Sequence, residues 1–137
     1  MRTIAKTLVL LALTVSMHSA PLHAKTSSLD KYMEKGSGAI KSGNFKKAIY
    51  SLKRAVKELE KPEDRSTSKI HVKALCLLSR AQTKEGDFGE ALANLTKSIE
   101  LYKSFGLADR ELATSINDEY AKLASKCTTV DLDKLGK

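Results

Sequence analysis

The chain repeats one sequence pattern, and that repeat limits the folds open to it. Residues 43–55 read GNFKKAIYSLKRA, and residues 86–98 read GDFGEALANLTKS. Both copies place Gly, then Asn or Asp, then Phe, Ala, Leu and a small residue at the same positions, and Gly43 and Gly86 set the offset at 43 residues. Self-similarity at this spacing is typical of stacked helical repeats, which usually present a binding surface rather than an active site.

The first 24 residues have the layout of a secretory signal peptide. Arg2 and Lys6 supply positive charge, an uncharged apolar run covers residues 7–17, and the segment ends at the small residue Ala24. We therefore expect cleavage near Ala24 and a domain over residues 25–137. The alternative is an uncleaved anchor, but eleven apolar residues are too few to cross about 30 Å of hydrocarbon. The style of the signal indicates a bacterial protein that is periplasmic or secreted.

Without the signal, the chain has 22 basic and 16 acidic residues, a formal charge of +6. This balance favours acidic partners or anionic surfaces, although a charge of this size also serves solubility alone. No second long apolar run occurs, so we expect no transmembrane segment in the mature domain.

The two cysteines, Cys76 and Cys127, could form one disulfide in an exported protein. The helix positions below set them about 12 Å apart along neighbouring helices, which exceeds the reach of a disulfide without rearrangement. The alternative is that Cys76 is a small, half-buried apolar residue.

Apolar residues recur at helical spacing in five segments, and no strand pattern competes with them. The predicted helices cover residues 29–42, 45–60, 69–84, 88–104 and 109–126. The polar tail, residues 127–137, is expected to fray.

Local residues predict where these helices begin and end. The residues expected to cap helix N-termini are Ser28, Asn44, Asp87 and Asp109. Glu90 lies three residues after Asp87, as in a capping box. Gly43 and Gly86 can take the left-handed conformation that ends a helix.

Small residues mark where paired helices should approach closely. Ala48 and Ala91 occupy equivalent positions in the two copies, where a larger side chain would push the helices apart. Leu78 and Tyr120 correspond at a spacing of 42 residues, so residues 109–126 look like the first helix of a third, incomplete unit.

This pattern resembles the tetratricopeptide repeat, a helix-turn-helix unit, over about residues 29–126. The matching pairs are Gly43/Gly86, Phe45/Phe88, Ala48/Ala91, Leu52/Leu95 and Ala55/Ser98, with Gly36, Ser79 and Ala121 at the small-residue position of the first helices. The spacing of 42–43 residues exceeds the usual 34 and is similar to the longer repeats of the kinesin-light-chain type. The resemblance implies an all-α, short right-handed solenoid of antiparallel helix pairs. It would contain about 2.5 repeats, at residues 29–62, 68–106 and, in part, 108–126.

Residues for catalysis are scarce. His71 is the only histidine outside the predicted signal, and no Gly-rich phosphate loop, Cys-x-x-Cys pair or zinc-protease motif occurs. We therefore expect a protein that is not an enzyme and holds no cofactor or metal, with His71 as an exposed helix residue.

The resemblance implies that the first helices of the units line a concave face. Of fifteen positions mapped to that face, two are acidic and six are basic, a balance of +4. The six basic residues are Lys41, Lys73, Arg80, Lys84, Lys122 and Lys126. We expect them to bind an acidic peptide or a terminal carboxylate, with Arg80 and Lys122 as exposed central contacts. The alternative is an ordinary solvated face.

Some members of that family bind a C-terminal carboxylate through a set of Lys, Asn and Arg residues. Met33, Ser37 and Leu77 replace three members of the set here. Recognition of chaperone tails is therefore not implied.

A second basic strip is predicted on the outer face of residues 45–60. It contains Lys46, Lys47, Lys53, Arg54 and Lys57, with Tyr50 as the one aromatic residue nearby. The sequence therefore predicts an exported adaptor that binds a protein or peptide on its concave face, or else a protein that binds polyanions or anionic surfaces through this strip. It leaves open whether an exposed helix edge mediates self-association.

Overall fold

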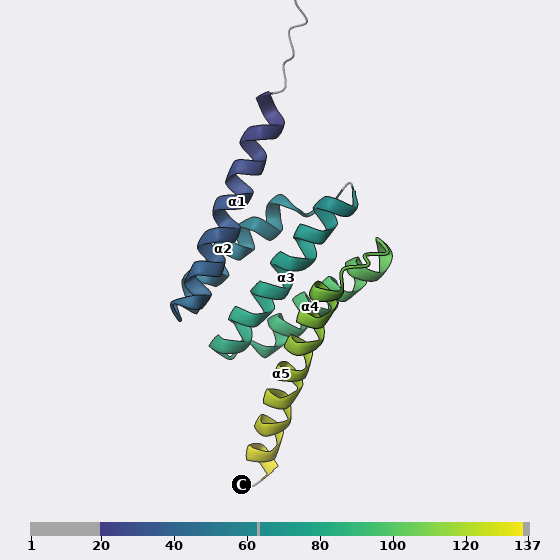
Figure 1. Ribbon diagram of the computed structural model, residues 1–137. Coiled ribbons are helices and arrows are strands. Elements are labelled where there is room, and N and C mark those ends of the chain that lie inside the picture. Colours follow the sequence, from purple (N-terminus) through teal and green to yellow (C-terminus); the bar gives the residue numbers. More distant parts are fainter. Residues whose placement is uncertain (1–19, 63, 136–137) are drawn as a thin grey trace, which may run out of the picture.

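A computed structural model of the chain describes residues 20–62 and 64–135, with side chains described for residues 28–62 and 64–127. Five α-helices account for most of the described residues, and no strand occurs among them, so the predicted all-α class is confirmed. The helices are α1 (Ala20–Lys41), α2 (Phe45–Glu58), α3 (Arg65–Glu85), α4 (Phe88–Ser104) and α5 (Arg110–Leu135) (Figure 1).

Of the predicted signal peptide, residues 1–19 lie outside the described residues, and residues 20–24 belong to the start of α1. Within the part of the chain that is described, no helix combines the length and the apolar character needed to cross a bilayer.

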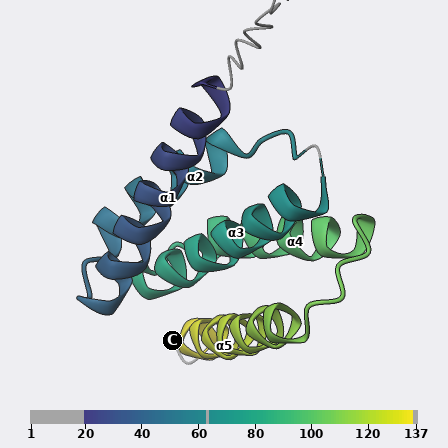
Figure 2. The same cartoon turned by 45° about the horizontal axis from the view of Figure 1, so that its top comes forward.

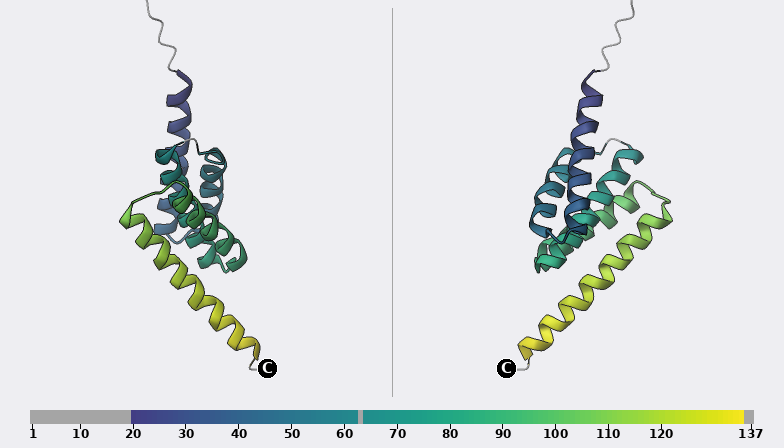
Figure 3. Two further views of the ribbon diagram at one scale, coloured as in Figure 1. Left: turned by 90° about the vertical axis from the view of Figure 1, so that its right-hand side faces the viewer. Right: turned by 60° about the vertical axis from the view of Figure 1, so that its left-hand side comes forward.

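The central helix is α3, which contacts all four others. α1 pairs with α2 and α3 pairs with α4 in antiparallel fashion, while α1, α3 and α5 run in roughly the same direction (Figures 1 and 2). α1 contacts α3 and α3 contacts α5, whereas α2 and α4 do not contact each other in the described chain. The three co-directional helices therefore share one side of the molecule, and the C-terminal part of α5 projects beyond the rest (Figure 3).

Two of the predicted helix caps are confirmed. Asn44 Oδ1 accepts a hydrogen bond from the backbone N–H of Lys47 at 3.1 Å, and Asp109 Oδ1 accepts one from the backbone N–H of Leu112 at 2.9 Å. Both side chains satisfy an N–H that the helix itself leaves unpaired.

Two other predicted caps differ from the structure. Asp87 occupies the N-cap position of α4 as predicted, but its side chain makes no capping hydrogen bond, so the predicted capping box with Glu90 does not form. Ser28 lies inside α1, because that helix begins at Ala20. The Ser28 hydroxyl instead donates to the carboxylate of Glu58 at 3.0 Å, which ties α1 to the end of α2.

The start of α3 lies earlier than predicted, at Arg65 rather than Lys69, because Asp64 and Thr67 form a capping box. The backbone N–H of Thr67 donates to Asp64 Oδ1 at 2.7 Å, and this hydrogen bond lowers the pKa of Asp64. At the other end of the chain, α5 continues to Leu135, past the predicted end at Lys126.

Close approach between paired helices depends on small residues, as expected. A Cβ atom added at Gly36 would lie 2.6 Å from Cγ of Leu52, so α1 can only approach α2 this closely with glycine there. At the equivalent position of α3, the Ser79 hydroxyl donates to the backbone oxygen of Ala91 at 2.8 Å. Ala48 and Ala91 are completely buried.

The core is divided between the two sides of α3. Two apolar clusters join α1, α2 and α3, and their buried centres include Leu52, Leu59 and Leu78. A third cluster joins α3, α4 and α5. Its buried members are Val72, Cys76, Ala91, Leu95, Leu112, Ile116 and Leu123.

The outer face of α5 ends this stack of helices. Val72, Leu75 and Ser79 are buried in α3, but their counterparts 42 residues later, Thr114, Asn117 and Ala121, are exposed on α5. The apolar residues Val72 and Leu75 of α3 thus correspond to the polar residues Thr114 and Asn117 on the face of α5 that no described helix covers.

We expect the two glycines in the middle of α1 to respond oppositely to alanine. Gly36→Ala should lower the free energy of unfolding by roughly 1–3 kcal/mol, because the new methyl group would overlap Leu52. Gly38→Ala should raise it by up to about 1 kcal/mol, since that site is open and alanine favours the helix. Urea denaturation measures both, and equal effects would contradict the described approach of α1 to α2.

We expect α5 to be required for solubility. A chain ending at Leu107 would expose Leu95, Ile99 and Tyr102, which pack in the cluster shared with α5. Size-exclusion chromatography should show dimers or aggregates, and the melting temperature should fall. A control chain ending at Cys127 keeps the α5 residues of that cluster and should stay monomeric. A monomeric, equally stable chain ending at Leu107 would show that α5 does not cover the cluster.

Candidate functional site

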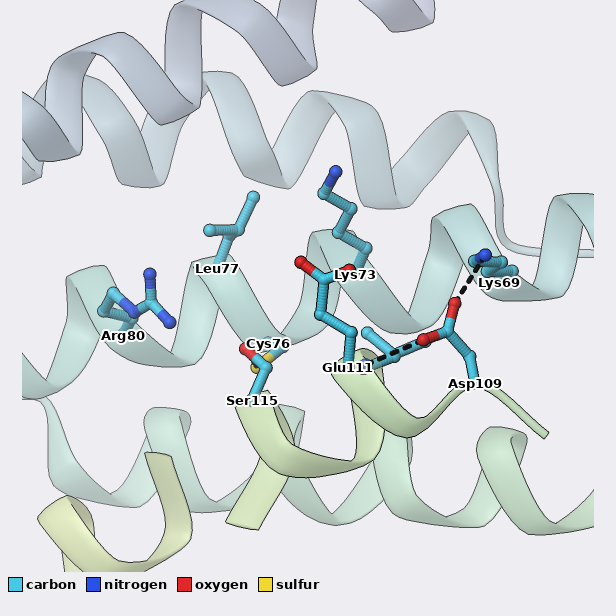
Figure 4. A pocket seen from close by; sticks show the side chains of 9 residues that line it. Lys69, Lys73, Cys76, Leu77, Arg80, Asp109, Glu111 and Ser115 are labelled. Atoms are coloured by element: carbon cyan, nitrogen blue, oxygen red, sulfur yellow. Dashed lines mark hydrogen bonds and ion pairs between the residues drawn. The ribbon is translucent and has the colours of Figure 1, made fainter. Parts of the chain in front are cut away.

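A pocket of about 330 Å³ lies between α3 and α5, on the side that α1, α3 and α5 share (Figure 4). Its lining consists of Lys69, Lys73, Cys76, Leu77, Arg80, Asp109, Glu111, Leu112 and Ser115. Two of the six predicted binding residues, Lys73 and Arg80, are among them. The pocket combines a small apolar floor with charged side chains at its rim.

The basic residues of the pocket form a row along α3. Lys69, Lys73 and Arg80 are separated by four and seven residues, which places all three on one face of a helix (Figure 4). Lys73 and Arg80 are two turns apart, roughly 10 Å along the axis. Cys76 and Leu77 lie between them and contribute apolar surface.

Carboxylates at the start of α5 face this row. Lys69 forms an ion pair with Asp109, and this contact lowers the pKa of Asp109 and raises the pKa of Lys69. The Glu111 side chain points toward Lys73 (Figure 4), although no ion pair joins them. The pocket therefore carries both signs of charge, in contrast to the strongly basic face predicted from the sequence.

Glu119 is the residue that the sequence analysis missed. Its carboxylate is only 3% exposed, and its Oε1 lies 2.7 Å from Arg80 Nε and 3.3 Å from Lys122 Nζ. The two predicted central contacts thus share one buried carboxylate. Glu119 is equivalent in the repeat to Leu77 and to the exposed Glu34, so the sequence carried no signal that its carboxylate would be buried.

Arg80 is held in one orientation by this contact. Only its Nε is bonded, and its two terminal nitrogens have no hydrogen-bond partner among the described residues. Its side chain is one-third exposed, so the prediction that it is freely exposed is wrong. The end of the guanidinium keeps the geometry that binds a carboxylate through two parallel hydrogen bonds.

The other predicted binding residues lie away from the pocket. Lys41 and Lys84 are exposed near the C-terminal ends of α1 and α3, and Lys122 and Lys126 are exposed on α5. None of these four lines the pocket.

Both cysteines are free thiols. Cys76 is buried, its Sγ lies 3.7 Å from the Ser115 hydroxyl, and burial raises the pKa of its thiol, which suppresses reactivity. Cys127 lies twelve residues beyond Ser115 on α5, about 18 Å along the helix. A disulfide between Cys76 and Cys127 is incompatible with this arrangement.

The basic strip predicted on α2 is exposed. Lys46, Lys47, Lys53, Arg54 and Lys57 all face solvent. Tyr50 is 62% exposed, and the Arg54 guanidinium lies 5.4 Å from its ring centre and donates to its hydroxyl at 3.1 Å. This strip has no carboxylate partner that forms an ion pair within the described residues.

In the described residues, neither a metal site nor His71 adds to this pocket. No group of His, Cys, Asp and Glu in the described chain is arranged to hold a metal ion. His71 is buried rather than exposed, which corrects the prediction, and it lies outside the pocket. Comparison with family models, with curated proteins and with solved structures finds no match to this chain.

We expect Arg80 to stabilise the fold more than Lys122 does. Arg80→Met removes the closer partner of a buried carboxylate and should cost about 1–3 kcal/mol in unfolding free energy. Lys122→Met removes a 64% exposed partner and should cost less than about 1 kcal/mol.

The double variant Arg80→Met, Glu119→Met is the control, because it leaves no buried charge behind. It should recover most of the stability that Arg80→Met loses. Equal losses for Arg80→Met and Lys122→Met in urea denaturation would refute the special role of Arg80.

Proposed function

We propose that the protein is a non-enzymatic adaptor of the helical-repeat type, which binds a protein or peptide segment in the pocket between α3 and α5. The observation that carries the proposal is the pocket itself, in which Lys73 and Arg80 lie on either side of an apolar floor. Small mixed pockets of this kind suit a short segment with one acidic group and one apolar side chain.

The arrangement of the helices supports a short solenoid similar to tetratricopeptide repeats. Helix pairs follow each other at an offset of 43 residues, and the first helices of successive units contact one another while α2 and α4 stay apart. Gly36 and Ser79, which the resemblance assigns to the small-residue position of the first helices, both contact the partner helix of their pair. In such a solenoid the shared side of α1, α3 and α5 would be the binding side.

The contacts of Arg80 and Lys122 narrow the chemistry of the ligand. Glu119 and Asp109 already balance part of the positive charge, so charge alone does not favour a highly acidic partner. A single ligand carboxylate placed at the terminal nitrogens of Arg80 would gain directed hydrogen bonds, and Lys73 would add a mobile charge two turns away. We place this activity in the periplasm or outside the cell, on the basis of the signal-like N-terminus.

The second candidate is binding to a polyanion or an anionic surface through the α2 strip. The Arg54–Tyr50 stack and the exposed lysines around it favour this candidate. The strip holds one aromatic residue, which is fewer than a stacking platform for single-stranded nucleic acid needs.

The deciding experiment compares two charge reversals of equal size at exposed lysines. A partner captured from the native envelope fraction is titrated against Lys73→Glu and against the control Lys53→Glu on α2. We expect Lys73→Glu to weaken binding at least tenfold and Lys53→Glu to leave it within twofold, because only Lys73 lines the pocket. Neither variant disturbs Glu119, so both should remain folded.

The opposite result assigns the function to the strip. If Lys53→Glu alone weakens binding, and the affinity falls steeply as salt rises, the protein binds a polyanion or an anionic surface through the α2 strip and not a peptide in the pocket. Equal losses in both variants would mean that net charge, and not the pocket, controls binding.

A further inference from the structure

His71 is a buried histidine without hydrogen bonds. Its side chain is 1% exposed, and both ring nitrogens lack a partner. Within residues 28–62 and 64–127, these are the buried side-chain nitrogen or oxygen atoms left unpaired. Buried polar atoms without partners are rare in folded proteins, since each costs about 1–3 kcal/mol of unfolding free energy.

His71 lies in the first two turns of α3, the helix that contacts both members of the first pair and its own partner α4. Ser68, Ala74 and Leu75 are three or four residues away on the same face of α3, and all three are completely buried. The charged groups that act on the ring come from the two neighbouring helices: Glu60, just beyond α2, and Lys97, on α4. The joint is defined here as the buried surroundings of His71 in α3, the helix that packs against both α2 and α4.

The repeat itself does not require an imidazole at this place. The equivalent positions are Ser28, 43 residues earlier, and Ala113, 42 residues later. Small residues therefore serve in α1 and α5, and the histidine is particular to the central helix, which contacts all the others.

A neutral ring is stable at this buried position, whereas a protonated ring carries a large free-energy cost there. Removing an imidazolium from water without a hydrogen-bond acceptor is costly, and burial together with the positive charge of Lys97 lowers the pKa of His71 from 6.5 to about 4, against a smaller opposing effect of Glu60. The unfolded chain therefore takes up the proton at a higher pH than the folded chain does. Protonation of His71 thus does not lower the free energy of unfolding above pH 6.5. The free energy of unfolding decreases as the pH falls from 6.5 toward 4.

We propose that His71 is an acid-sensitive joint: its protonation loosens the packing of α3 against α2 and α4, so that the protein opens reversibly as its surroundings become acidic. The inference does not depend on the proposed binding function.

The first test measures the protonation of the ring directly in the full chain. The imidazole proton signal of His71, identified in NMR spectra by its absence from His71→Gln, should move with a midpoint below pH 5. A midpoint near 6.5, the value of a solvated histidine, would overturn the proposal.

The second test measures stability in urea between pH 7 and pH 4.5, above the range in which Asp64 and Asp109 titrate. The unfolding constant of the wild-type chain should rise about five- to sevenfold per pH unit below 6.5, and by about 60-fold between pH 7 and pH 4.5. His71→Leu, which cannot take up a proton, should be at least as stable at pH 7 and should lack this rise. An equal rise in both chains would refute the role of His71.

If His71→Leu fails to fold, the wild-type chain still decides the question, because its own titration midpoint and its own dependence on pH must agree. A low midpoint without a loss of stability between pH 6.5 and 4.5 would overturn the proposal.

Discussion

The close approach of α1 to α2 and of α3 to α4 is the constraint on which the rest of this structure depends. Gly36 leaves room for Leu52, and Ser79 uses its hydroxyl to bond the backbone of α4 rather than to fill space. Because small residues lie where the two helices of a pair touch, large apolar residues of the pair can pack against the next helices of the chain. That arrangement brings α1, α3 and α5 to one side, where side chains from α3 and α5 meet around a pocket.

Charge then decides what that pocket can do. Leu112, Ile116 and Leu123 pack α5 against α3 and α4, and ion pairs at Asp109 and Glu119 fix its position along the basic row. A buried carboxylate with two cations is weak evidence for stability, since its desolvation offsets much of the attraction. Its clearer consequence is orientation, because Arg80 is held by Nε while its terminal nitrogens remain available. Carboxylates thus balance part of the positive charge around the pocket, while the terminal nitrogens of Arg80 stay available as hydrogen-bond donors of fixed direction.

The sequence was sufficient to predict the helices and their pairing but not the electrostatics. Five helices, the caps at Asn44 and Asp109, and the buried Ala48 and Ala91 follow from periodicity and local hydrogen-bond chemistry, which act within a few residues. The capping box at Asp64 was missed, because the surrounding polar residues look like a loop. Glu119 and His71 were missed for a different reason: their burial is set by helices that lie far away in the sequence, and repeat alignment alone gives no sign of which charges meet across α3 and α5. The solenoid class and the binding role stay predictions.

α3 connects these separate features. The same helix carries His71, on which Glu60 and Lys97 act, and Lys73, Cys76 and Arg80, which line the pocket shared with α5. His71 and Lys73 are two residues apart and therefore point in clearly different directions, so the joint and the pocket do not share atoms but do share a backbone. A shift of α3 relative to α4 would change both faces, since the Ser79 bond to Ala91 and the Arg80 bond to Glu119 begin at neighbouring residues. A ligand that needs Arg80 in its present orientation would therefore favour the closed joint. Protonation of His71 would then weaken the binding of that ligand, and the ligand would disfavour the protonation of His71 by the same free energy.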